Sequence, residues 1–161
     1  MSEQLKVTAA SVIVIVLAVI AVALIGSHFS VMNRDWYEAL RKPSFQPPNW
    51  VFGAVWTVLF ILAAVSAILI WNTPPRTPLT HWIMALFALN GILNVLWSAL
   101  FFGDRLIYPA IWDAALLCLS TVMIIILAWP ISRAGSILFI PYALWTAFAT
   151  YLTHTIWKLN A

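Results

Sequence analysis

The sequence predicts an all-α integral membrane protein, a bundle of five transmembrane helices with a structured first loop. Hydrophobic residues make up 64% of the 161 residues and charged residues only 8%, whereas a soluble globular protein carries about a quarter charged residues. The few charges lie mostly between five apolar stretches, each long enough to cross the hydrocarbon core as a helix. This composition excludes a soluble enzyme, a disordered tail and a nucleic-acid-binding domain, so we expect no nucleic acid partner.

The five spans are expected at about residues 7–27, 49–71, 80–102, 106–129 and 134–157, within a single domain over residues 1–161. The first follows Lys6 as in a signal peptide, but its apolar run is longer than a secretory h-region and no small-residue cleavage site follows it. We therefore expect a retained helix. Prolines on both sides trim the second span, because proline interrupts a helix. The fourth span is broken only by Asp113.

The loop charges predict the orientation. With five spans, the two termini face opposite sides of the membrane. The basic residues on the side of the first loop, the third loop and the C-terminus are Arg34, Arg41, Lys42, Arg105 and Lys158. The other side carries Lys6, Arg76 and Arg133. Because cytoplasmic loops are enriched in Lys and Arg, we expect the first loop and the C-terminus in the cytoplasm.

The first loop, roughly Ser27 to Pro48, is the one long connection. It holds Trp36, Tyr37 and Phe45 and ends in prolines. Tryptophan and tyrosine near a span end are typical of the interfacial aromatic belt, which accounts for any single one of these residues. The three aromatic residues together with the rigid proline exit favour a lid folded over one end of the bundle.

Three polar residues are expected inside the membrane. Asp113 is the only acid within a span, and a carboxylate at the bilayer centre costs about 3 kcal/mol on insertion scales. It should therefore face the bundle interior, either lining a site or pairing with another helix. Asn90 and Asn94 stand at i and i+4 on the third span, with Trp97 one turn further on the same face. Their amides either line a site or hydrogen-bond across helices as packing contacts.

The chain has 10 tryptophans, far more than ordinary usage. Six lie near span ends, where the aromatic belt explains them. Four lie deeper, at Trp56, Trp97, Trp112 and Trp145, where indole N–H groups need partners. Trp56 and Trp145 are candidates to face one another across a pocket, and the small Ala149 would leave room for a flat ligand beside Trp145. Helix packing alone also selects such an alanine.

Residues for metal binding or conventional catalysis are not grouped. His28, His81 and His154 are far apart, with no pair at metal-ligand spacing on one span. The single cysteine, Cys118, excludes an internal disulfide. No Ser-His-Asp set, phosphate-binding loop or paired carboxylate is present. We expect no metal and no resident cofactor, and neither a hydrolase nor an ATP-driven pump.

Several segments resemble one family. The run WYEALRKPSFQPPNWVF at residues 36–52 is similar to the first loop of the TspO/MBR family, which includes the bacterial tryptophan-rich sensory proteins and the mitochondrial translocator protein, or peripheral-type benzodiazepine receptor. The similarity continues through Val55-Trp56-Thr57, the Trp112-Asp113 pair and the run PYALWTAFATYL at residues 141–152. It covers nearly the whole chain in the family's order, so the chain resembles a bacterial-type member.

The resemblance implies a five-helix bundle, usually a homodimer, in a bacterial cell membrane. It also implies a pocket beneath the first loop for porphyrins, sterol-like lipids or isoquinoline-carboxamide drugs. Carried over by position, the pocket lining would comprise Trp36, Tyr37, Pro43, Pro47, Trp56, Phe60, Asn90, Asp113, Ala114, Trp145 and Ala149. The sterol-recognition pattern often placed on the family's last helix is not met, because Leu144 and Lys158 both stand too far from Tyr151.

Three functions follow as expectations from the resemblance. The first is binding and sensing of a tetrapyrrole such as protoporphyrin IX, with the polar edge of the ligand met by Asn90 or Asp113. The second is an enzyme that degrades protoporphyrin in light and oxygen, in which Trp56 and Trp145 would be the catalytic residues and porphyrin the substrate. The third is transport of porphyrin or lipid, for which five spans without a repeat give little support. Binding and sensing is the leading expectation.

Overall fold

The computed structural model describes residues 3–161, with side chains from residue 9 onward, and confirms the all-α membrane bundle. Five long helices are apolar enough to cross a membrane: α1 (Glu3–Met32), α3 (Asn49–Asn72), α4 (Pro78–Ser98), α5 (Ile107–Ala128) and α6 (Arg133–Asn160). A π-helical turn, η1 (Ala99–Gly103), extends α4. The short helix α2 (Arg34–Ala39) lies in the first loop. Helix α1 continues to Met32, beyond the expected end at residue 27.

Local signals explain several helix ends. Prolines precede α3, and Thr73 and a Pro74-Pro75 pair follow it. Helix α4 begins with a capping box, in which Thr77 and Thr80 exchange side-chain to backbone hydrogen bonds of 3.4 and 3.2 Å. Helix α6 begins at a Ser132 cap whose hydroxyl accepts from the Gly135 N–H at 3.2 Å.

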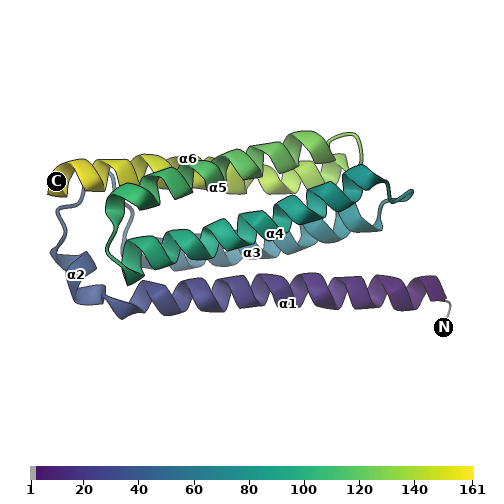
Figure 1. Cartoon of the computed structure of the whole chain (residues 1–161), viewed down its shortest axis with the longest axis horizontal. Helices are drawn as coiled ribbons and strands as arrows, with labels where there is room; N and C mark the ends of the chain where they lie inside the picture. Colours follow the sequence, from purple (N-terminus) through teal and green to yellow (C-terminus); the bar gives the residue numbers. More distant parts are fainter. Residues whose placement is uncertain (1–2) are drawn as a thin grey trace.

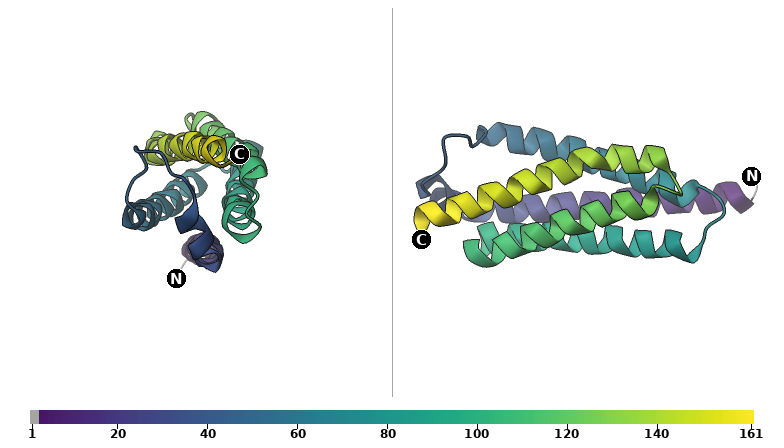
Figure 2. Two further views of the ribbon diagram at one scale, coloured as in Figure 1. Left: turned by 90° about the vertical axis from the view of Figure 1, so that its left-hand side faces the viewer. Right: turned by 90° about the horizontal axis from the view of Figure 1, so that it is seen from above.

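The five long helices form one ring. Helix α6 packs between α3 and α5, α5 packs against α4, and α1 closes the ring between α4 and α3. Figure 2 shows this arrangement end on, with α1 apart from the pair formed by α5 and α6. Both α2 and the C-terminus lie at the same end of the bundle (Figure 1). We call this the loop end and the other the far end.

The two ends are packed differently. The far end holds a cluster of fully buried side chains that includes Ile70, Ile83, Ile124 and Phe139. The loop end has a smaller buried cluster around Phe101, against which aromatic residues of the first loop and η1 pack. Between this cluster and the middle of the bundle, the side chains leave a cavity.

Candidate functional site

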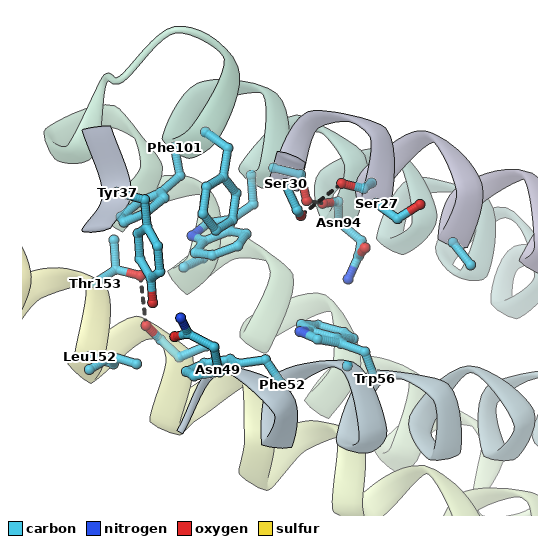
Figure 3. Close-up of a pocket in the computed structure, with 18 of the residues that line it drawn as sticks. Ser27, Ser30, Tyr37, Asn49, Phe52, Trp56, Asn94, Phe101, Leu152 and Thr153 are labelled. Atoms are coloured by element: carbon cyan, nitrogen blue, oxygen red, sulfur yellow. Dashed lines mark hydrogen bonds between the residues drawn. The ribbon is translucent and has the colours of Figure 1, made fainter. Parts of the chain in front are cut away.

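A cavity of about 580 Å³ lies inside the loop end of the bundle. All five long helices, α2 and η1 contribute to its wall (Figure 3). Its volume is within the range of about 300–1,000 Å³ typical of small-molecule sites. The residues that line it are Ala23, Leu24, Gly26, Ser27, Ser30, Val31, Arg34, Tyr37, Glu38, Asn49, Phe52, Gly53, Trp56, Thr57, Phe60, Asn94, Trp97, Ser98, Phe101, Phe102, Ala114, Leu117, Trp145, Thr146, Ala149, Leu152, Thr153 and Ile156.

One wall of the cavity is aromatic and comes from α3 and α6. Trp56 stacks on Phe60 with ring centroids 5.4 Å apart. One turn earlier, Phe52 meets Trp145 edge to face at 5.7 Å. Because α3 and α6 pack side by side, the two tryptophans occupy neighbouring parts of one wall rather than opposite walls. The small Ala114 and Ala149 also line the cavity, leaving space in front of these rings.

A second aromatic group forms the upper part of the cavity, beneath the first loop. Trp97 stacks on Phe101 with centroids 5.2 Å apart, and Phe101 meets Phe102 edge to face at 4.9 Å. Tyr37 of α2 contacts both phenylalanines, at 6.1 and 5.3 Å. A flat apolar ligand would therefore meet aromatic rings on more than one side, and aromatic contacts contribute about 0.5–1.5 kcal/mol each beyond buried area.

The polar groups of the cavity are mostly hydroxyls that are already used as donors. Ser27, Ser30 and Thr57 donate to carbonyl groups three or four residues earlier in their own helices, at 2.8–2.9 Å. Thr146 and Thr153 do the same on α6, at 3.0 and 2.8 Å. These bonds use the hydroxyl hydrogens but leave lone pairs free. The hydroxyls can therefore accept hydrogen bonds from a ligand more readily than donate them.

The first loop covers the loop end, as the lid interpretation expects. The Arg41 N–H donates to Asn160 Oδ1 at 2.9 Å, and Asn160 Nδ2 returns a bond of 2.9 Å to the Arg41 carbonyl, which joins the loop to the last residues of α6. Phe45 stacks on Tyr151 with centroids 5.4 Å apart. Trp36 packs edge to face on Phe101 at 5.8 Å. The loop is thus held by both polar and aromatic contacts.

Tyr37 is a residue of the first loop that lines the cavity. Gln46 Nε2 donates to its hydroxyl at 3.1 Å, and the Lys42 ammonium lies 4.3 Å from its ring centroid. Burial raises the pKa of the Tyr37 phenol, and the hydrogen bond from Gln46 offsets part of that rise. The phenol therefore stays protonated at neutral pH. At the cavity mouth, Arg34 pairs with Glu38 at 3.0 Å.

A third loop contact fixes the junction of α1 and α2. Asn33 Nδ2 donates to the carbonyl groups of Phe102 and Gly103, at 2.6 and 3.0 Å. The Asn33 side-chain oxygen accepts from Arg105 at 2.5 Å. These bonds satisfy carbonyl groups at the end of the π-helical turn, which would otherwise lack intrahelical partners.

The structure brings together only part of the expected pocket lining. The residues that line the cavity are Tyr37, Trp56, Phe60, Ala114, Trp145 and Ala149. The remaining ones, Trp36, Pro43, Pro47, Asn90 and Asp113, do not line it. Trp36 and the two prolines belong to the covering loop. Asn90 lies deeper and hydrogen-bonds across to α5, with Nδ2 2.8 Å from Ser120 Oγ and 2.9 Å from Thr121 Oγ1. These bonds indicate that Asn90 contributes to the packing of α4 against α5.

Asp113 faces the bundle interior but not the cavity. Its side chain is 5% exposed, and neither carboxylate oxygen has a hydrogen-bond partner among the described residues. The next residue, Ala114, does line the cavity. Because one residue turns a helix by about 100°, this single step carries Asp113 off the cavity wall. The described residues contain no group of three His, Cys, Asp or Glu side chains able to hold a metal ion.

Sequence reasoning missed the contribution of α1. Gly26, Ser27 and Ser30 line the cavity, as does Phe52 of α3. The signal was present as a group of small residues near the end of an otherwise bulky first span. Asn94, considered for packing or for a site, does both: its Nδ2 donates to the buried Tyr142 hydroxyl at 3.0 Å, and it lines the cavity.

Comparisons of the sequence with known proteins find several relatives. The sequence profile of the TspO/MBR family matches residues 12–158. The chain is 40% identical to the tryptophan-rich protein TspO of Bacillus cereus over 129 residues, which cover 80% of this chain and 83% of that protein. It is 31% identical to the human translocator protein over 126 residues, 78% of this chain and 75% of that one. The tryptophan-rich sensory protein of Cereibacter sphaeroides is 28% identical, over 78% of this chain and 77% of its own.

Proposed function

Starting from the fact that this chain belongs to the TspO/MBR family, we propose that it is a membrane-embedded binding and sensing protein for tetrapyrroles. Protoporphyrin IX is the ligand that we propose to test first. Other flat hydrophobic molecules, such as isoquinoline-carboxamide compounds or sterol-like lipids, would compete for the same cavity. In this proposal porphyrin is the ligand and regulation of tetrapyrrole or stress metabolism is the output.

One observation carries the proposal: a cavity inside a membrane bundle is walled by stacked aromatic rings with a few polar groups between them. Trp56 and Trp145 lie on one wall, and Trp97 with Phe101 forms another. A tetrapyrrole is a flat, apolar aromatic ring system with polar substituents at its edge. Ring stacking would bind its faces, and the Asn94 amide would meet its polar groups.

Binding is better supported than conventional catalysis. Among the residues that line the cavity, the ionisable side chains are Arg34, Tyr37 and Glu38, all at the loop end. Arg34 and Glu38 pair with each other, and the Tyr37 phenol is a poor proton donor because its pKa is raised. General acid–base chemistry needs a group whose pKa is near the working pH and within reach of the ligand.

A second candidate function is favoured by the same tryptophans. Light- and oxygen-dependent degradation of protoporphyrin needs electron-rich side chains beside the ring rather than a proton-transfer pair. Trp56 and Trp145 lie in the cavity wall, where they would contact a bound porphyrin. In this candidate they would be the catalytic residues, and porphyrin would be the substrate.

The test is a titration of purified protein with protoporphyrin IX in the dark, followed by porphyrin absorbance under illumination in air. Saturable tryptophan quenching with an unchanged absorbance supports binding and sensing. Protein-dependent bleaching that is lost in Trp56→Phe or Trp145→Phe supports degradation. Trp82→Phe is the matched control, because Trp82 is 71% exposed on α4 and does not line the cavity. Absence of saturable binding contradicts both functions.

Membrane, orientation and assembly belong to the same proposal. We propose a bacterial cell membrane, with the loop end in the cytoplasm because Arg34, Arg41, Lys42, Arg105 and Lys158 gather at that end. We also propose a homodimer surrounded by membrane lipid. Labelling of Ser44→Cys in a Cys118→Ala background by a membrane-impermeant maleimide tests the orientation. Labelling in inside-out vesicles but not in intact cells is expected.

A further inference from the structure

The cavity is closed along the bundle axis at the far end and is covered by the first loop at the loop end, where the exposed Arg34 and Glu38 also line it. At the loop end, Tyr37 packs on Phe101 and Phe102, and two hydrogen bonds between Arg41 and Asn160 hold the loop across the opening. At the far end, buried side chains of the core fill the bundle. A ligand that approached along the axis would have to displace one of these packed regions.

The wall made by α4, η1, α5 and α6 is closed as well. Its cavity-lining residues are largely buried, among them Asn94, Phe101, Leu117, Thr146 and Leu152. Helix α5 is the most buried of the five spans, with 39% of its 18-residue apolar segment buried inside the protein. Packed helices therefore cover this side of the cavity.

The edge between α1 and α3 is different, because cavity-lining residues there are exposed on the outer surface. On α1, Leu24 is 65% exposed and Val31 is 67% exposed. On α3, Gly53 and Thr57 line the cavity and are also exposed. A Cβ atom added at Gly53 would have no heavy atom within 4 Å. Figure 3 shows Ser27 and Ser30 on one side of this space and Phe52 and Trp56 on the other.

Helix packing explains why this edge is open. Near the loop end, α1 packs closely against α4 and η1. A Cβ atom placed at Gly91 would lie 3.0 Å from the Val22 side chain, and one placed at Gly103 would lie 3.1 Å from the Phe29 ring. Asn33 adds its bonds to the end of η1. The hydrogen bond that joins α1 to α3 lies instead toward the far end, where Trp71 Nε1 donates to Ser11 Oγ at 2.8 Å.

The opening lies at the depth of the membrane hydrocarbon. Leu24 is ten residues before the charged Arg34, which corresponds to about 15 Å along a helix. The segments that border the gap, residues 23–31 of α1 and 53–57 of α3, contain no Lys, Arg, Asp or Glu. Since five spans place these segments in the bilayer, the gap faces lipid rather than water.

We propose that the gap between α1 and α3 is a lateral portal through which flat hydrophobic ligands enter the cavity from the bilayer. The portal would admit molecules that first partition into lipid, and it would exclude water-soluble ones. This inference rests on the proposed ligand-binding function for its physiological meaning. The absence of a side chain at Gly53 and the small side chains of Ser27 and Thr57 keep the portal open, and the loop stays closed while ligand passes.

The first experiment narrows the portal with Gly53→Trp, a position where an added Cβ atom meets no neighbouring atom within 4 Å. Protoporphyrin IX association and dissociation are followed in lipid vesicles by stopped-flow tryptophan quenching. Both rates should fall about tenfold or more, equivalent to at least about 1.4 kcal/mol of added barrier. Ile61→Trp is the control, because Ile61 is exposed on α3 but does not line the cavity.

A second variant tests the axial route. Asn160→Ala removes both side-chain bonds that hold the loop to α6. With a lateral portal, its association rate should stay close to that of the unmodified protein. Faster association in Asn160→Ala together with unchanged rates in Gly53→Trp would overturn the portal in favour of entry beneath the loop.

A third experiment does not depend on porphyrin binding. Ala149→Cys in a Cys118→Ala background places one thiol on the cavity wall. A lipid-soluble phenylmercury reagent should modify this thiol rapidly, whereas a sulfonated, charged analogue of the same reagent should modify it slowly. Gly53→Trp should slow the reaction with the lipid-soluble reagent about tenfold. Slowed modification without porphyrin binding would support the portal and contradict the proposed function. Equal rates with both reagents, unaffected by Gly53→Trp, would overturn the portal even if porphyrin binds.

Discussion

Two glycines in the same bundle show how differently its two ends are built. At the far end, a Cβ atom added to Gly135 would lie 2.8 Å from Ile70 Cγ1 and 3.2 Å from the Ser66 carbonyl oxygen. At the loop end, a Cβ added to Gly53 would meet nothing within 4 Å. The first glycine permits close approach of α3 and α6, whereas the second borders the cavity. Close packing and the cavity therefore lie at opposite ends of the same helices.

The types of buried residue also differ between the far end and the loop end. At the far end, Ile70, Ile83 and Ile124 fill the interior, and the Ser66 hydroxyl donates to the Gly135 carbonyl at 2.8 Å. In lipid, such close packing and interhelical hydrogen bonds are the main sources of helix association, because the surrounding tails are also apolar. At the loop end, large rings alternate with alanine and serine and do not fill the space between helices.

The largest expected effect is a loss of stability at the closely packed far end. Gly135→Ala should lower the stability of the protein by about 1–3 kcal/mol, because Ile70 and the Ser66 backbone must move to admit the methyl group. Gly53→Ala should leave stability unchanged or raise it by up to about 1 kcal/mol through helix propensity. Thermal unfolding of both variants in one detergent measures the difference. Equal melting temperatures would show that the two ends do not differ in packing.

The next effect separates the two asparagines of α4. Asn90→Leu removes hydrogen bonds to Ser120 and Thr121 and should cost about 1–2 kcal/mol of stability. The Kd for protoporphyrin IX should not change, since Asn90 does not line the cavity. Asn94→Leu should change both properties, because Asn94 bonds to Tyr142 and lines the cavity. A weaker porphyrin affinity in Asn90→Leu alone would contradict this assignment.

A smaller effect is expected from the aromatic wall. Trp56→Phe and Trp145→Phe keep an aromatic ring but reduce stacking area, so each should weaken porphyrin binding by about 0.5–1.5 kcal/mol, or roughly 2- to 12-fold in Kd. Stability should change little because both side chains are only partly buried. Isothermal or fluorescence titration in the dark measures Kd, with Trp82→Phe as the control. Identical porphyrin affinities in all three variants would show that this aromatic wall is not part of the binding site.

The smallest effect concerns the covering loop. Asn160→Ala should make protease cleavage within residues 40–48 faster, because it removes two exposed hydrogen bonds that together contribute about 1 kcal/mol or less to holding the loop. Porphyrin dissociation should stay close to that of the unmodified protein, because the ligand leaves through the proposed portal while the loop stays closed. Faster cleavage together with much faster dissociation would show that the loop controls ligand release.

The sequence predicted the bundle well because the membrane leaves few alternatives. Long uncharged stretches must form helices when no water is present to satisfy the backbone, and prolines and charges mark their ends. The family resemblance also identified Trp56, Phe60, Ala114, Trp145 and Ala149, all of which line the cavity. Within the first loop, aromatic residues and prolines indicated a cover, and the loop lies over the bundle end.

The depth and rotation of individual side chains were not predictable from sequence. Asn90 and Asn94 share one face of α4, yet only Asn94 reaches the cavity, because contacts of Asn90 with α5 fix the relative height of the two helices. Asp113 and Ala114 are adjacent, yet only Ala114 lines the cavity. The contribution of α1 was missed because glycine and serine carry no distinctive binding chemistry. These features depend on contacts between distant segments, which a single sequence does not display.

The central claim is that the cavity at the loop end binds the ligand. The most direct measurement is dark titration of Ala149→Trp and Ala147→Trp with protoporphyrin IX. Ala149 lines the cavity, whereas Ala147 lies two residues away on the exposed face of α6. We expect Ala149→Trp to fill the cavity and abolish saturable binding, whereas Ala147→Trp should bind porphyrin normally. Normal binding in both variants would place the porphyrin site elsewhere in the protein.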